Sequence, residues 1–414
     1  MSDDHLPGTH VHRHPGANAE VSVATQVASP ASKRGTSGEA YLKTKGALLW
    51  KIGGGKWEVE DIEYEEPKDG EALVKLAASG LCHSDYHYIT GDGTLDALPL
   101  LGGHEGAGVV LEVGPNCKDI QVGDHVITTF MPSCGKCRWC VNGRSQLCDR
   151  GAGLLSGKQL DGTNRCFTNG TPVAQMTYIG TFSPYIVAPE DSLIKIDPEV
   201  PLEKVAIVGC GVPTGWGSAV YLAGVEVGDT VCIVGVGGVG MNAVQGARIA
   251  GASNIVAIDP VEWKRKAAVE TFGATHEAAS IAEAMELVGD LTHGVMADKT
   301  IIHQGVVDGQ LVQPALDLTS KGGVLAISGV SSMSQVDAKL SIFGLVLMEK
   351  QIRGGLYGSC NPRTDIPKLV ELYKRGDLLL DELVTRTYTL EEINQGYADM
   401  EEGRNLRGLI VFED

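Results

Sequence analysis

Positive charge is scarce in this chain, which has 34 lysine and arginine residues against 52 aspartate and glutamate residues and a net charge of −18. No basic run is long enough to follow a phosphate backbone, which excludes nucleic acid as a partner. Two long uncharged windows, residues 205–225 and 230–247, are dense in glycine, and the first contains Pro213, so neither is typical of a lipid-facing helix. The chain also begins without a basic-then-apolar signal segment and shows no internal repeats. We therefore expect a cytoplasmic protein with no membrane partner.

Residues 1–42 lack any apolar period and are rich in serine, alanine, threonine, glycine and proline. This composition predicts a disordered tail. The tail carries His5, His10, His12 and His14, which we expect to be solvated, with adventitious metal binding as the alternative.

The remaining chain is long enough for two domains. Residues 43–212 contain short apolar runs broken by glycine, proline and aspartate, which predicts a β-rich catalytic domain with strands at 47–50, 57–64, 72–78, 108–113 and 125–130. Residues 213–353 alternate between strand and helix patterns, which indicates a doubly wound parallel sheet and hence the α/β class. Residues 354–414 have helical patterns at 365–374 and 390–402 and a last strand at 408–412, and we expect them to pack back onto the first domain.

Four of the ten cysteines form the strongest motif in the chain. They follow the spacing C-x2-C-x2-C-x7-C, at Cys134, Cys137, Cys140 and Cys148. In the reducing compartment that we expect, clustered thiols are metal ligands more often than disulfides. Four thiolates close around one tetrahedral zinc with no open position, so we predict a structural zinc site. A redox-active or buried cysteine cluster is the alternative.

A second constellation centres on His104 and Glu105, which stand between glycines in the segment Leu-Gly-Gly-His-Glu-Gly-Ala-Gly. A histidine between glycines is by itself more often a turn residue than a ligand. Cys82 lies upstream, however, and Cys210 lies far downstream between two glycines. Two thiolates and one imidazole make an open zinc site that leaves a fourth position for water or an alcohol.

A glycine motif follows the apolar run at 230–236 and precedes a helical stretch that reaches about residue 250. It reads Gly235-Val-Gly-Gly-Val-Gly240, so Gly237, Gly238 and Val239 stand inside it, and a second apolar strand at 254–258 ends at Asp259. Strand, glycines, helix, strand and acid in this order predict dinucleotide binding, with the pyrophosphate at the helix N-terminus and Asp259 on the adenosine ribose. An acid at this place repels a 2′-phosphate, which favours NAD over NADP. Lys264 is a candidate for the same ribose, with a solvated lysine as the alternative.

These motifs together resemble the zinc-dependent medium-chain alcohol dehydrogenases, from about residue 43 to the C-terminal end. The segments Cys82-His-Ser-Asp85, Gly103-His-Glu105, the four-cysteine lobe, Gly209-Cys-Gly-Val-Pro-Thr-Gly215 and 235–240 carry the resemblance. It implies a GroES-like catalytic domain and a Rossmann cofactor domain. The insertion around Asp161-Gly-Thr-Asn-Arg165 is similar to that of the class I and class III enzymes. The segments 215–220, 259–262 and 358–362 are most similar to the actinobacterial nicotinoprotein branch, assayed with nitroso-dimethylaniline as electron acceptor.

The resemblance also implies roles for single residues. It places a catalytic zinc on Cys82, His104 and Cys210 and a structural zinc on the four-cysteine lobe, with Glu105 behind the catalytic ion and Asp85 holding the histidine ligand. Further matches are a proton relay of Ser84 and His87, cofactor contacts at Thr214 and Arg407, and a wall of the substrate pocket at Phe130. His83 departs from the family pattern, in which many members carry arginine against the cofactor pyrophosphate. A neutral imidazole is a weaker phosphate partner than guanidinium, so tight cofactor binding must come from elsewhere.

The expected activity is oxidation of an alcohol to an aldehyde, with hydride transfer to a tightly bound NAD(H) that an external electron acceptor re-oxidises. The alternatives are a dehydrogenase that exchanges NAD, including one acting on a thiol adduct of formaldehyde, and a non-catalytic nucleotide-binding protein on the same fold. We expect a homo-oligomer, either a dimer or a tetramer. The remaining cysteines and four further histidines have no predicted ligand role; they are Cys117, Cys166, Cys232, Cys360, His125, His276, His293 and His303.

Overall fold

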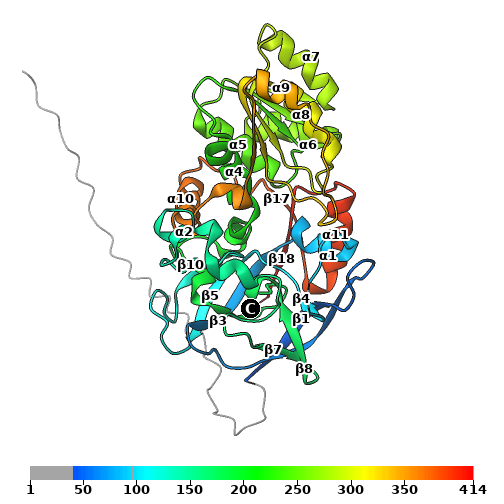
Figure 1. Ribbon diagram of the computed structural model, residues 1–414. Helices are drawn as coiled ribbons and strands as arrows, with labels where there is room; N and C mark the ends of the chain where they lie inside the picture. The colour runs from blue at the N-terminus through cyan, green and yellow to red at the C-terminus, as the bar shows by residue number, and fades with distance from the viewer. Residues whose placement is uncertain (1–40, 96, 414) are drawn as a thin grey trace, which may run out of the picture.

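The structure is a computed structural model that describes residues 41–95 and 97–413. The four histidines of the predicted tail lie outside the described residues, and the tail prediction extends one residue too far, because strand β1 (Leu42–Leu49) begins at Leu42. Figure 1 shows two lobes, one rich in strands and the other built from a sheet with helices around it.

The first lobe contains two mostly antiparallel systems, a closed five-stranded barrel and a seven-stranded sheet; the pairs β4–β8 and β17–β18 are parallel. The barrel strands, in spatial order, are β1, β2 (Trp57–Tyr64), β7 (Cys166–Thr168), β8 (Thr171–Gln175) and β4 (Leu100–Leu101). The sheet strands are β10 (Leu193–Lys195), β6 (His125–Thr128), β5 (Gly106–Val113), β3 (Glu71–Gly80), β18 (Arg407–Val411) and β17 (Val384–Tyr388), with β9 (Tyr185–Pro189) paired to β3. Strand β3 is buried along almost its whole length, because it pairs with β5, β9 and β18.

The second lobe is a six-stranded parallel sheet. Its spatial order is β13 (His276–Ala278), β12 (Asn254–Ile258), β11 (Thr230–Val234), β14 (Ala297–Ile302), β15 (Thr319–Ile327) and β16 (Gln351–Gly354). All five residues of β11 are buried, as a parallel strand covered on both faces requires. The strand order reverses between β11 and β14, which is the switch point at which doubly wound sheets bind their ligands. The predicted α/β class is therefore confirmed.

Helices connect and cover these strands. In chain order they are α1 (His83–Thr90), α2 (Arg138–Val141), α3 (Leu202–Val205), α4 (Gly211–Gly217), α5 (Gly240–Ala250), α6 (Glu262–Ala267), α7 (Ile281–Leu291), α8 (Val312–Leu318), α9 (Ile342–Leu347), α10 (Pro362–Lys374) and α11 (Ile393–Glu401). Strand β18 pairs with β3, so the last segment of the chain completes the sheet of the first lobe.

The largest core cluster joins the two lobes. It contains Ala78 of β3, most apolar residues of the uncharged window 205–225, and Val231 of β11. Among the described residues, no single helix is long and apolar enough to cross a membrane; one pair, Leu202–Gly209 and Gly211–Ala223, passes that length and composition test only together, with a 57° bend between its halves. The window therefore packs in the core between the lobes, where it places Cys210 and Thr214.

Candidate metal centres and cofactor cleft

Cys82, His104, Glu105 and Cys210 come together from three separate segments of the chain. Cys82 directly precedes α1, His104 and Glu105 lie in the loop before β5, and Cys210 directly precedes α4. All four are buried, and one potential ligand atom from each lies within 4.8 Å of the others. Gly103 permits this loop because it adopts a φ of 86°, and a methyl group there would lie 2.7 Å from the backbone nitrogen of Phe182.

Asp85 orients the histidine of this cluster. Nδ1 of His104 lies 3.2 Å from Oδ2 and 3.3 Å from Oδ1 of the fully buried Asp85, and the Gly103 N–H donates to Oδ1 at 2.8 Å. The opposite nitrogen, Nε2 of His104, is buried and has no hydrogen-bond partner among the described residues. An unpartnered imidazole nitrogen beside two thiols is a donor set that suits Zn²⁺.

The two thiols of the cluster differ in acidity. A hydrogen bond with Cys210 lowers the pKa of Cys82 well below its usual range, although burial acts in the opposite direction. The same interaction raises the pKa of Cys210. The hydrogen bond between the two sulfurs therefore favours a shared negative charge on the pair, as a cation at this site requires.

Glu105 is held by groups on the side of the cluster that faces the C-terminal strand. One of its oxygens pairs with the Arg407 guanidinium, and the other accepts a hydrogen bond of 2.9 Å from the Gly211 N–H. Burial raises the pKa of Glu105 to about 7, although Arg407 opposes this shift. Arg407 also packs against the glycine motif, because a methyl group on Gly238 would lie 2.1 Å from its Cδ. This arginine therefore connects the metal cluster to the predicted cofactor loop.

One cleft of about 1100 Å³ contains both the metal cluster and the nucleotide motif. Its walls include all predicted catalytic-zinc ligands, most of the predicted cofactor residues and Phe130. The predicted site residues that line this cleft are Cys82, His83, Ser84, His87, His104, Phe130, Cys210, Thr214, Gly235, Gly237, Gly238, Val239, Asp259, Lys264 and Arg407. Gly240 does not line the cleft; a methyl group there would lie 1.9 Å from the Gly235 carbonyl oxygen, so this glycine permits a close backbone contact.

Asp259 follows β12 at the cofactor end of the cleft. Its carboxylate accepts hydrogen bonds from the N–H groups of Val236 at 3.0 Å and Val261 at 2.9 Å, so backbone groups fix its position. Lys264 lines the cleft nearby, with Nζ 5.9 Å from the centre of the Trp263 ring, and burial lowers its pKa.

The predicted relay residues lie on α1 at the other end of the cleft. Ser84 lies beside the metal cluster, with Oγ 3.6 Å from the Cys82 sulfur. His87 is buried, and its Nδ1 lies 3.9 Å from Oδ2 of Asp92. No direct hydrogen bond joins Ser84 to His87 within the described chain, so a relay between them requires a bridging group.

An aromatic pair forms the wall above the cluster. The Phe130 ring lies 6.0 Å from the His104 ring and 4.6 Å from the Tyr357 ring, edge to face in both cases. Sequence reasoning missed Tyr357 and also Met176 and Thr177, which line the same cleft. Tyr357 and Thr177 have positive φ values of 59° and 50°, a conformation that no local sequence signal predicts for a tyrosine or a threonine.

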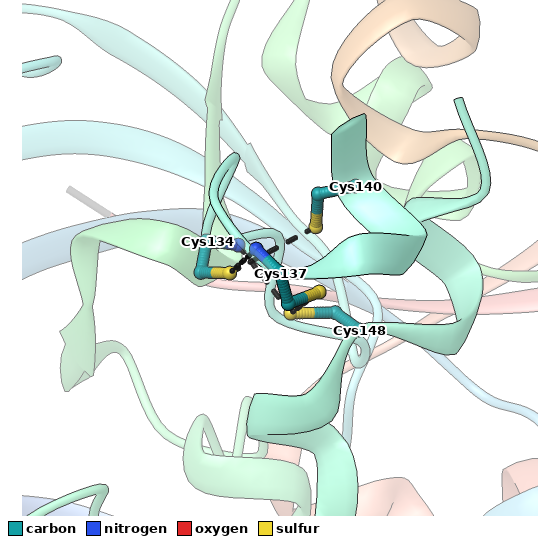
Figure 2. A group of neighbouring side chains, drawn as sticks. All are labelled: Cys134, Cys137, Cys140 and Cys148. Carbon is teal, nitrogen blue, oxygen red and sulfur yellow. Dashed lines mark hydrogen bonds between the residues drawn. The ribbon is translucent and has the colours of Figure 1, made fainter. Parts of the chain in front are cut away.

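The four-cysteine lobe forms a second candidate metal centre. Figure 2 shows the side chains of Cys134, Cys137, Cys140 and Cys148 gathered in one place, and their sulfurs lie within 4.8 Å of one another. Sulfur–sulfur distances are 3.9 Å for the pair Cys134 and Cys140 and 3.9 Å for the pair Cys137 and Cys148, so no disulfide is formed. The N–H groups of Lys136 and Cys137 donate to the Cys134 sulfur at 3.4 Å, as expected around a thiolate. This arrangement fits a closed tetrahedral zinc site.

Two family models match this chain. Residues 68–198 match the alcohol dehydrogenase GroES-like domain, and residues 238–375 match the zinc-binding dehydrogenase domain. Alcohol dehydrogenase B of Mycobacterium tuberculosis is 49% identical over 374 residues, which cover 90% of this chain and 99% of that protein. The NDMA-dependent alcohol dehydrogenase of Amycolatopsis methanolica is 47% identical over 370 residues, or 89% of this chain and 99% of that protein. Among solved structures, benzyl alcohol dehydrogenase from Acinetobacter calcoaceticus superposes with a TM-score of 0.82 at 28% identity, covering 90% of this chain and 100% of that one.

Proposed function

Because this chain belongs to the zinc-binding medium-chain alcohol dehydrogenases, we propose that it oxidises an alcohol to an aldehyde by hydride transfer to NAD, and that the NAD(H) stays bound and is re-oxidised by an external acceptor. The observation that carries this proposal is the single cleft in which the open metal cluster and the glycine motif with Asp259 face the same space. The relative named NDMA-dependent supports the part of the proposal that concerns the acceptor.

In the proposed enzyme, Cys82, His104 and Cys210 hold the catalytic zinc, and the four-cysteine lobe holds the structural one. Zinc in the open site lowers the pKa of an alcohol hydroxyl, and NAD accepts the hydride. Asp85 keeps Nδ1 of His104 occupied, so that Nε2 faces the two sulfurs. The pair Glu105 and Arg407 places a balanced charge behind the cluster.

The protein's own contribution to the chemistry is a proton path and an apolar wall. Ser84 would accept the alcohol proton while its own hydroxyl proton passes to a bridging group such as a ribose hydroxyl, from which His87, in the middle of α1, would receive a proton. Phe130, Tyr357 and Met176 exclude water from the carbon that loses hydride. The wall suits an alcohol with an apolar substituent.

The choice of NAD over NADP rests on Asp259. Backbone hydrogen bonds hold its carboxylate at the end of β12, where its negative charge repels a 2′-phosphate. Arg265 lies near, but its Nη1 donates to the carbonyl oxygens of Asp259 and Pro260, and its Nε pairs with Glu277. These contacts direct the guanidinium towards backbone carbonyls and Glu277, which disfavours a role for this arginine as a 2′-phosphate site.

The first measurement is the nucleotide content of the desalted, denatured full-length protein. A stoichiometric amount of NAD(H) is expected, together with alcohol oxidation in the presence of nitroso-dimethylaniline that added NAD does not accelerate. Nucleotide-free protein whose turnover depends on added NAD contradicts the resident cofactor. It supports the exchanging dehydrogenase instead, and formaldehyde–thiol adducts are then tested as substrates beside simple alcohols.

We also propose that the chain forms a homo-oligomer through the edge of the parallel sheet. Helix α9 has no buried residue, and Ile342, Phe343, Val346 and Leu347 are each more than 60% exposed. The neighbouring strand β16 is the last in its sheet, so one row of its backbone groups is free to pair. A second copy of the chain, related by a twofold axis, covers both features with the same surface.

A further inference from the structure

His303 occupies a central place in the cofactor cleft, although the sequence indicated no role for it. It directly follows β14 at the carboxyl end of the strand, beside the switch point between β11 and β14. The glycine motif lies against it, because a methyl group on Gly235 would lie 3.0 Å from the His303 carbonyl. His303 is buried and lines the cleft.

A chain of three hydroxyl and imidazole hydrogen bonds fixes the tautomer of His303. The Ser218 hydroxyl donates to the Thr214 carbonyl oxygen at 2.6 Å, so Ser218 has no hydrogen left and must accept from the Ser328 hydroxyl at 2.8 Å. Ser328 has then used its only hydrogen, so it must accept from Nδ1 of His303 at 3.0 Å. His303 therefore carries its proton on Nδ1, and Nε2 is an acceptor.

Nε2 of His303 is buried and has no partner among the described residues. Burial lowers the pKa of this imidazole to about 3, so the ring is neutral near pH 7. A buried acceptor without a hydrogen-bond partner destabilises the folded protein. A neutral acceptor nitrogen has neither a hydrogen nor a positive charge with which to bind a phosphate. The chemistry that satisfies it is a hydroxyl or an amide N–H.

The position of His303 indicates which half of a dinucleotide supplies this donor. Across the sheet, the carboxyl ends run from Asp259 after β12, through the glycine motif after β11, to His303 after β14. A dinucleotide with its adenosine ribose on Asp259 and its pyrophosphate on the glycines continues towards His303 with its nicotinamide half. Gly305, two residues later, touches the His83 ring on α1, where a methyl group would lie 2.8 Å from the ring. This contact places the segment at the catalytic end of the cleft.

We propose that Nε2 of His303 accepts a hydrogen bond from the nicotinamide half of the bound cofactor, from either a ribose hydroxyl or the carboxamide N–H. The inference rests on the proposed use of NAD, and it assigns to His303 a cofactor-retaining contact. Such a contact also compensates for the histidine at position 83, where many family members carry arginine.

Two substitutions separate the acceptor from the rest of the side chain. In His303→Asn, an amide N–H still donates to Ser328, but no acceptor reaches the position of Nε2. In His303→Gln, the amide oxygen reaches that position, while the bond to Ser328 is lost. Full-length, zinc-loaded proteins freed of nucleotide are compared by calorimetric titration with NAD, its 3-acetylpyridine analogue, ADP-ribose and AMP.

We expect His303→Asn to bind NAD about tenfold more weakly than the unmodified protein and to bind AMP unchanged, with His303→Gln recovering most of the loss. If a ribose hydroxyl is the donor, His303→Asn binds ADP-ribose, NAD and the 3-acetylpyridine analogue more weakly, and by the same factor. If the carboxamide N–H is the donor, His303→Asn loses affinity for NAD alone, because the acetyl analogue has no N–H and ADP-ribose has no nicotinamide ring. AMP lacks the nicotinamide half and reports on the integrity of the cofactor domain.

His303→Asn that binds NAD as tightly as the unmodified protein overturns the inference while leaving the proposed function intact. Loss of AMP binding together with NAD binding also overturns it, since the effect is then general damage to the domain. An unmodified protein that binds none of the dinucleotides refutes the proposed function itself, and with it this role for His303.

Discussion

At the scale of single residues, Asp85 is the side chain whose role the geometry defines best. It lies against Nδ1 of His104 and accepts a hydrogen bond from the Gly103 N–H. Among the described residues, it forms no hydrogen bond with either sulfur of the cluster. Asp85→Asn keeps the size of the side chain and removes its charge, so zinc affinity at the catalytic site is expected to fall about 10- to 100-fold. Competition with a chromophoric chelator measures this change.

Asp92→Asn is the matched control, because the Asp92 carboxylate lies near His87 and accepts from the Thr90 hydroxyl, away from His104. This variant is expected to retain zinc as the unmodified protein does. Equal zinc affinity in Asp85→Asn and Asp92→Asn contradicts the orienting role of Asp85.

The candidate ligands were accessible to sequence reasoning because Cys82 and Cys210 accompany His104 and because the four-cysteine spacing is typical of a zinc site. His303 was not, since its partner Ser328 lies 25 residues away, Ser218 behind that serine lies 85 residues away, and both carry common hydroxyl side chains. Tyr357 was missed for a similar reason: a tyrosine enters the metal cleft only because the chain turns there through positive φ. Such roles depend on contacts between distant segments, which residue type and spacing do not encode.

At the scale of elements, the four-cysteine lobe depends on its metal more than on apolar burial. Helix α2 and the 3-10 turn Asp149–Gly153 have no buried residue. Cys148→Ser is therefore expected to lose one of the two predicted zinc ions per subunit and to become sensitive to protease within the lobe, while the catalytic cluster keeps its metal. Elemental analysis combined with limited proteolysis tests this expectation.

Cys117→Ser provides the control for a lost thiol, because Cys117 lies outside both clusters and its sulfur donates to the Glu71 carbonyl oxygen. Its metal content is expected to equal that of the unmodified protein. A protease-resistant lobe in zinc-depleted Cys148→Ser would show that the lobe folds without metal.

The longer strands of the first lobe were predictable as short apolar runs broken by glycine, proline and aspartate, and in β2 the apolar residues Trp57, Ile62 and Tyr64 are buried. The two-residue strand β4 and the short strands β7 to β10 were not. They are too short to carry a period of their own, and pairing with neighbours defines them. The predicted strand at 125–130 likewise ends earlier, at Thr128, because only residues 125–127 pair with β5 and residues 126–128 with β10.

At the scale of the whole molecule, the exposed apolar face of α9 predicts the state of assembly. Val346→Lys places a charge in the middle of that face and is expected to weaken self-association at least about tenfold. Val227→Lys is the control, since Val227 is 87% exposed and belongs to the turn before β11. Light scattering over a range of concentrations measures the molar mass of both variants. An oligomer that is unchanged in Val346→Lys refutes this interface.

Strand β18 has a consequence for the order in which the protein is made. It lies between β3 and β17 in the sheet of the first lobe, and it carries Arg407 to the partner carboxylate of Glu105. Residues 407–411 leave the ribosome only after the complete parallel sheet, so the domain that begins first is finished last. During synthesis the middle of the chain has the local contacts it needs to fold, while residues 78–80 of β3 lack their partner strand on one side. A nascent chain stalled before residue 407 therefore leaves the 78–80 end of β3 unpaired by β18 and leaves the carboxylate of Glu105 without its arginine.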